Sequence, residues 1–139
     1  MINRLLLPAI AVTLSMLVGC ASQNSHVLAG GSQVELRSMQ TRAFDTSNKE
    51  LMLRTVIATL QDLGFIIDKA DSDIGTVTAT KLSGYQIRMT VTVRARGETQ
   101  LLVRANAMYN LKAIEDPQPY QDFFNSLSKA IFLTAHDVD

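Results

Sequence analysis

Apolar and polar residues alternate cleanly between Tyr85 and Arg96, the most regular pattern in the chain. A period of two predicts a β-strand with one buried face and one solvated face, as is typical of an antiparallel sheet. The apolar positions are Tyr85, Ile87, Met89, Val91, Val93 and Ala95. The polar positions are Gln86, Arg88, Thr90, Thr92, Arg94 and Arg96.

A turn at Gly97 and Glu98 follows this strand and predicts a hairpin with a partner strand over 100–109. The expected inward positions of the partner are Leu101, Val103, Ala105 and Ala107.

Two segments show the period of a helix instead. Over 47–63 the apolar stripe consists of Leu53, Val56, Ile57, Leu60 and Leu63, and Gly64 then offers a C-terminal cap. Ser47 and Glu50 have the spacing of a capping box, so the pattern places the helix start there.

A second helix is expected to begin near Pro119, a residue favoured in the first turn. Its expected inner stripe is Tyr120, Phe124, Leu127, Ile131 and Thr134.

Three further strands complete the expected order β-α-β-β-β-β-α. They are expected over 34–44, over 65–70 and, after a turn at 71–75, over 76–81. Two amphipathic helices can bury the apolar face of such a sheet if both pack on the same side. The pattern therefore predicts a two-layer α+β domain over 34–135, with an antiparallel sheet, followed by a short tail at 136–139.

The N-terminus predicts a different kind of segment. Residues 1–4 are weakly basic, residues 5–18 are apolar, and Leu17-Val18-Gly19 leads directly to Cys20, the only cysteine. The apolar run is shorter than the roughly 20 residues that a membrane-spanning helix needs. The motif resembles the lipobox of bacterial lipoproteins. The resemblance implies cleavage after residue 19 and a diacylglyceryl thioether on Cys20. A cleaved signal, or a buried anchor, with an incidental cysteine is the alternative.

Residues 20–33 are rich in Ser, Gly, Ala and Gln and predict a flexible tether behind the acylated cysteine. Position 21 is Ala rather than the Asp that retains many lipoproteins at the inner membrane. By resemblance to that sorting rule, we expect the periplasmic face of the outer membrane.

Charge and composition limit the partners. Removal of residues 1–19 leaves 120 residues with twelve basic and thirteen acidic side chains, which argues against a nucleic-acid binder. No residues assemble into a catalytic motif, so we expect a non-enzyme without a cofactor. The expected partners are the membrane, through the acyl chains on Cys20, and another envelope protein; the oligomeric state is not predicted.

Candidate metal ligands and bases are few. Asp71 and Asp73 have the spacing of a calcium loop, but the Glu expected further on is replaced by Leu82, and Asp with Gly75 also suits a tight turn. His26 and His136 lie in the expected tether and tail, so we predict no metal site.

Four arginines form the candidate interaction face. If the hairpin pairs through Gly97, Arg104 shares the outward face with Arg88, Arg94 and Arg96. Such a group can bind an acidic protein, an anionic headgroup or a peptidoglycan carboxylate. A solvated face balanced by nearby acids is the simpler alternative, and edge strands that pair with a partner's backbone are another.

One stretch of the domain resembles a known family. The residues are Leu63-Gly64-Phe65-Ile66-Ile67-Asp68, followed by Asp71 and by Asp73 to Ala79: a helix ending in Gly-Phe, a strand, an acidic turn and a Thr-rich strand. This order is similar to that in small envelope lipoproteins, including the helix-grip domains of the BamC (NlpB/DapX) family, accessories of outer-membrane protein assembly. The chain has one such domain where that family has two, and no family site residues carry over.

These features favour a non-catalytic, outer-membrane-anchored lipoprotein that binds another envelope component in assembly or transport. A carrier that holds a small molecule or lipid between helices and sheet is the alternative, and an apolar cavity of several hundred Å³ would support it. A hydrolase assembled from scattered residues is a third hypothesis, which the small number of groups that titrate near neutral pH disfavours.

Overall fold

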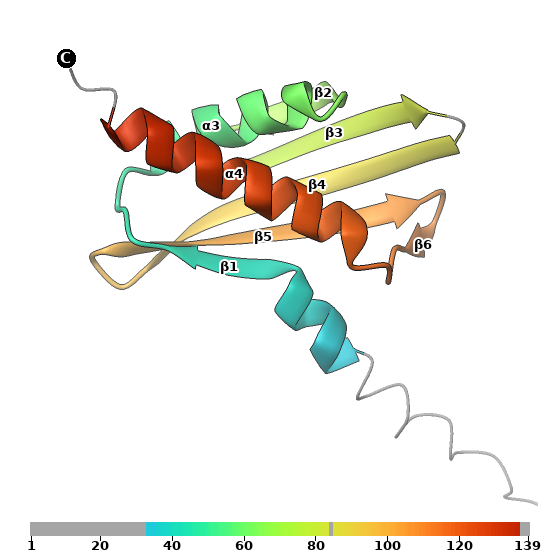
Figure 1. Cartoon of the computed structure of the whole chain (residues 1–139), viewed down its shortest axis with the longest axis horizontal. Coiled ribbons are helices and arrows are strands. Elements are labelled where there is room, and N and C mark those ends of the chain that lie inside the picture. Colours follow the sequence, from blue (N-terminus) through green and yellow to red (C-terminus); the bar gives the residue numbers. More distant parts are fainter. Residues whose placement is uncertain (1–32, 84, 137–139) are drawn as a thin grey trace, which may run out of the picture. The chain divides into compact units, whose positions relative to one another are not determined.

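The computed structural model describes residues 33–83 and 85–136, and its framework is one antiparallel sheet (Figure 1). The predicted signal peptide, Cys20, nearly all of the tether and the last three residues of the tail lie outside the described residues. The strands are β1 (Thr41–Phe44), β2 (Ile66–Asp71), β3 (Thr76–Ser83), β4 (Tyr85–Arg96), β5 (Gln100–Tyr109) and β6 (Lys112–Ala113). Their order is β1-β5-β4-β3-β2, and β6 also pairs with β5.

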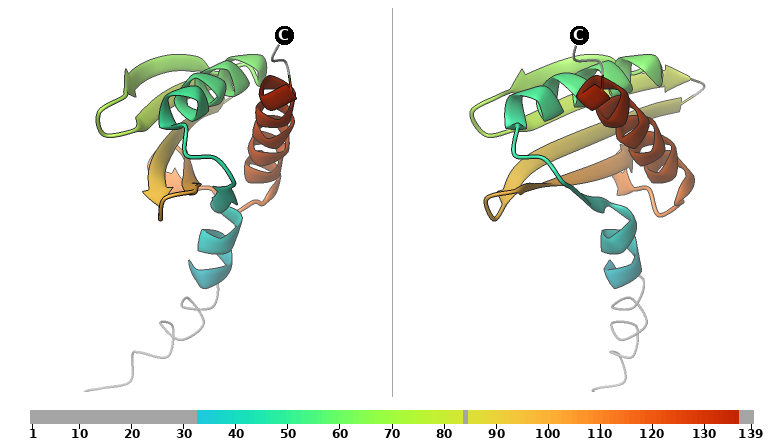
Figure 2. Two further views of the ribbon diagram at one scale, coloured as in Figure 1. Left: turned by 90° about the vertical axis from the view of Figure 1, so that its left-hand side faces the viewer. Right: turned by 60° about the vertical axis from the view of Figure 1, so that its left-hand side comes forward.

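Two helices, α3 (Lys49–Asp62) and α4 (Gln118–His136), pack on the same face of this sheet (Figure 2). The apolar side chains between the two layers form a single buried cluster. Its largest fully buried members are Tyr120, Phe123, Phe124, Met52, Leu60, Met89 and Leu127. The predicted two-layer α+β class is confirmed.

The β4–β5 hairpin matches its prediction closely. Gly97 has a φ of 65°, a left-handed conformation that suits glycine, and the pairing runs from Arg96↔Gln100 to Ile87↔Tyr109. The four inward positions predicted for β5 are all buried. On β4, Ala95 was predicted to point inward with the core residues, but it is exposed because it lies near the end of the strand.

The first predicted strand is wrong over most of its length. Residues 33–39 are helical, and only Thr41–Phe44 form a strand. Leu36 is buried in the core and Met39 packs against it, three residues apart, which is helical spacing. Strand propensity alone therefore misassigned a segment whose apolar residues follow the helical period.

The start of α3 also differs from the prediction. Asn48, not Ser47, is the N-cap: its Oδ1 accepts a hydrogen bond from the backbone N–H of Leu51 at 3.0 Å. Glu50 pairs with Arg54 at 2.6 Å instead of completing a capping box. Asn, Ser and Asp cap helices about equally well, so sequence spacing did not decide between adjacent candidates.

A buried hydrogen-bond network fixes the start of α4. The hydroxyl of Tyr120, which is fully buried, donates to the carbonyl of Ile114 at 2.6 Å. It accepts from Gln40 Nε2 and from the backbone N–H of Ala107, both at 3.3 Å. The network joins three segments that are distant in sequence. At the other end of α4, Thr134 was predicted to be inward but is exposed, and Phe123, not predicted, is buried.

Candidate functional site

The sheet face opposite the helices is polar, and none of the described elements packs on it (Figure 2). Strand register identifies its outward side chains, because residues directly opposite each other in an antiparallel pair point to the same face. On β4 and β5 these are Gln86, Arg88, Thr90, Thr92, Arg94, Arg96, Gln100, Leu102, Arg104, Asn106 and Met108. On β3 they are Thr76, Thr78, Thr80 and Leu82. The outward positions of these three strands thus carry four arginines and no acid.

The four arginines predicted for this face all lie on it and are all exposed, but they do not form one cluster. Arg94 lies opposite Leu102, so Arg104 is its diagonal neighbour at about 7–8 Å between Cα atoms. Arg96 follows two residues further along β4. Arg88 lies six positions from Arg94 along β4 and opposite Met108, four positions from Arg104, so it is about 13 Å or more from either of them. We call Arg94, Arg96 and Arg104 the arginine cluster.

The arginine cluster and Arg88 make no ion pair or side-chain hydrogen bond with any other described residue, whereas two other arginines are engaged. Arg54 pairs with Glu50 on the surface of α3. Arg42 of β1 points to the helix face, stacks on Phe124 at 5.0 Å from the ring centroid and donates to Ser128 Oγ at 3.2 Å. The guanidinium groups on the outer face thus keep their full donor capacity for a partner.

Threonines occupy the middle of the outer face, and none of them was predicted as a site residue. Thr78 and Thr90 lie opposite each other, with their hydroxyl oxygens 3.4 Å apart. Thr80 donates to Asp68 of the edge strand β2 at 2.6 Å. Alternating Thr at positions 76, 78 and 80 was the signal that could have identified this surface.

The edge strand β2 is a poor surface for strand addition. A register shift between Ile67 and Lys69 interrupts its pairing with β3, and Asp68 and Lys69 are exposed. Bulges and charged side chains are common means of protecting an edge strand from pairing.

The segment with calcium-loop spacing is a turn. Asp71 Oδ1 accepts from the backbone N–H groups of Asp73 and Ile74 at 3.1 and 3.2 Å, and Lys49 Nζ donates to the carbonyl of Asp73 at 3.1 Å. Gly75 has a φ of 71°, and a Cβ there would lie 2.5 Å from the carbonyl oxygen of Val93. Within the described residues, no group of His, Cys, Asp and Glu could hold a metal ion.

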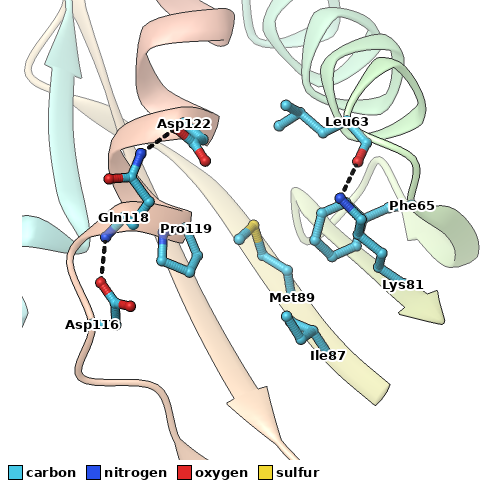
Figure 3. Close-up of a pocket in the computed structure, with 9 residues that line it drawn as sticks. All are labelled: Leu63, Phe65, Lys81, Ile87, Met89, Asp116, Gln118, Pro119 and Asp122. Carbon is cyan, nitrogen blue, oxygen red and sulfur yellow. Dashed lines mark hydrogen bonds between the residues drawn. The ribbon is translucent and has the colours of Figure 1, made fainter. Parts of the chain in front are cut away.

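A cavity of about 300 Å³ opens on the helix side, between the end of α3 and the first turn of α4 (Figure 3). Its apolar lining consists of Leu63, Phe65, Ile87, Met89 and Pro119. Its polar lining consists of Lys81, Asp116, Gln118 and Asp122. None of these four polar residues was predicted as a site residue, because they come from β3, α4 and the segment that precedes α4, and only the fold brings them together.

His136 lies at the exposed end of α4 against Phe132, with ring centroids 4.4 Å apart, and His26 lies outside the described residues. Among the helices of the described ranges, none combines the length and the apolar character that a membrane crossing requires.

In comparisons with known proteins, no family model matches the chain, and no curated protein is similar to it in sequence.

Proposed function

We propose that this protein is an outer-membrane lipoprotein, anchored through Cys20, whose domain binds an acidic surface of another envelope protein. The binding surface is the outer sheet face with Arg88 and the arginine cluster. The role is that of a non-catalytic accessory in envelope assembly or transport. The lipobox motif supports the anchor, and the geometry of the sheet supports the binding surface.

The observation that carries the proposal is the contrast between the arginines of the two layers. Arg42 and Arg54 have partners within the domain, whereas the outer-face arginines, like the exposed Arg37 before β1, have none among the described residues. Surface charges on an exposed protein face contribute little to folding stability, so stability does not explain this group. Complementary charge raises association rates and fixes the orientation of a partner, and arginine binds carboxylates with two parallel hydrogen bonds.

Crosslinking in intact cells tests this surface. A photoactivatable residue at Thr92, in the middle of the outer face, should give a reproducible adduct with an envelope protein. The same residue at Ala58, which is exposed on α3, should not. Arg94→Glu with Arg104→Glu should abolish the adduct, because the acidic partner would be repelled.

Arg54→Glu is the matched control, since it reverses an exposed arginine on the opposite layer. It should leave the Thr92 adduct unchanged. An adduct that survives the double charge reversal, or equal adducts from Thr92 and Ala58, would contradict the proposed surface.

A further inference from the structure

The cavity between α3 and α4 has charges of opposite sign on opposite walls. Lys81 lies on the α3 side, where its Nζ donates to the carbonyl of Leu63 at 2.8 Å and sits 5.7 Å from the centre of the Phe65 ring. Asp116 and Asp122 lie on the α4 side (Figure 3). Ile87 and Met89 of β4 form the apolar floor between them.

The charged groups on both walls keep unused hydrogen-bonding capacity. An ammonium group has three N–H donors, and Lys81 uses one of them on Leu63. Asp116 accepts from the backbone N–H of Gln118 at 2.9 Å, and Asp122 accepts from Gln118 Nε2 at 2.7 Å, each through Oδ1. The Oδ2 atoms of both carboxylates have no hydrogen-bond partner among the described residues.

We propose that this cavity binds a short zwitterionic peptide, of about two residues, with apolar side chains. Its C-terminal carboxylate would accept from Lys81, its N-terminal ammonium would donate to Asp122, and a side chain would pack on Ile87 and Met89. This site is separate from the outer sheet face, and the inference does not depend on the lipid anchor.

The two charged walls select a ligand whose charged groups lie apart, and a cavity of about 300 Å³ has room for a short peptide. Two extended residues span at most about 7 Å, since each contributes about 3.3–3.6 Å. In a free amino acid the two charged groups share one carbon atom, so a single residue would not bridge the walls. A dipeptide places one charge at each wall and leaves its side chains over the apolar floor.

Calorimetric titration of the purified full-length protein tests the site with four probes: leucyl-leucine, its N-acetyl derivative, its C-terminal amide and free leucine. Leucyl-leucine should bind tightest. Each blocked derivative should bind at least about tenfold more weakly, because it loses a charge-assisted hydrogen bond. Free leucine should also bind more weakly, because it cannot reach both walls.

Variants then assign each end of the peptide to its wall. In Lys81→Met the preference for the free dipeptide over its amide should disappear, while the preference over the N-acetyl form should remain. In Asp122→Asn the reverse should hold. Lys81→Arg should keep both preferences, and Lys69→Met, on the opposite face, is the matched control.

The wild-type protein alone can overturn the proposal, even if a variant fails to fold. Absence of binding at millimolar leucyl-leucine would overturn it, as would equal affinity for the free and the blocked dipeptides. Loss of both preferences together in Lys81→Met, with the thermal unfolding curve unchanged, would overturn the assignment of the two walls.

Discussion

At the scale of single residues, two buried hydroxyls of the helix layer differ in whether they have hydrogen-bond partners. The Tyr120 hydroxyl has three hydrogen-bond partners in three segments. The Thr59 hydroxyl is buried and has no partner among the described residues. Burying a polar group without a hydrogen bond is costly, whereas a satisfied buried network helps to specify one arrangement of the core. The two side chains should therefore respond to mutation with opposite signs.

Thr59→Val should stabilise the domain. Valine has nearly the shape of threonine and removes the unpaired hydroxyl, so we expect a gain of about 1 kcal/mol in the free energy of unfolding. Urea denaturation followed by circular dichroism measures it. Thr55→Val is the control, because the Thr55 hydroxyl donates to the Leu51 carbonyl at 2.8 Å and its loss should give no gain. A destabilised Thr59→Val would mean that the hydroxyl has a partner in solution.

Tyr120→Phe should destabilise the domain by about 2 kcal/mol, because it leaves the buried N–H of Ala107 and the amide of Gln40 without an acceptor. The same denaturation experiment measures the loss. Gln121→Ala, at the exposed neighbouring position, should change stability by less than about 0.5 kcal/mol. Equal stability of Tyr120→Phe and the wild type would refute the structural role assigned to the network.

At the scale of elements, regular periodicity predicted well and local signals predicted poorly. The β4–β5 hairpin follows from twelve alternating positions, a turn glycine and a second alternating run. The segment 34–44 was misassigned because it is short, and because Leu36 and Met39 are the only apolar pair that marks its helical turn. The β6 strand has two residues and no pattern of its own, so only its pairing with β5 defines it.

The cap of α3 gives a direct test at this scale. Asn48→Ala should cost about 1 kcal/mol of stability, because the first turn loses the acceptor for the N–H of Leu51. Ser47→Ala should cost much less, since Ser47 does not cap the helix. Chemical denaturation of both variants measures the difference. A larger loss for Ser47→Ala than for Asn48→Ala would favour the capping box that the sequence suggested.

At the scale of the whole molecule, the domain presents two distinct surfaces. The outer sheet face was predictable in part. Alternation placed four arginines on it, but five residues of β4 lie between Arg88 and Arg94, so these two arginines are not neighbours. The cavity was not predictable, because Lys81, Asp116 and Asp122 are brought together only by the packing of α4 beside the end of α3. No local pattern in the sequence predicts that α4 packs beside the end of α3.

The proposed binding of another envelope protein depends on the anchor, so lipidation of Cys20 is the central claim to test. Bacteria that express the full chain can be grown with an alkyne analogue of palmitate and then fractionated. Because Cys20 is the only cysteine, a thiol-linked lipid can attach nowhere else. The wild-type protein should be labelled and sediment with the outer membrane, and Cys20→Ser should remain unlabelled and unprocessed. An unlabelled wild type, or a Cys20→Ser protein that is processed and sediments identically, would contradict the account.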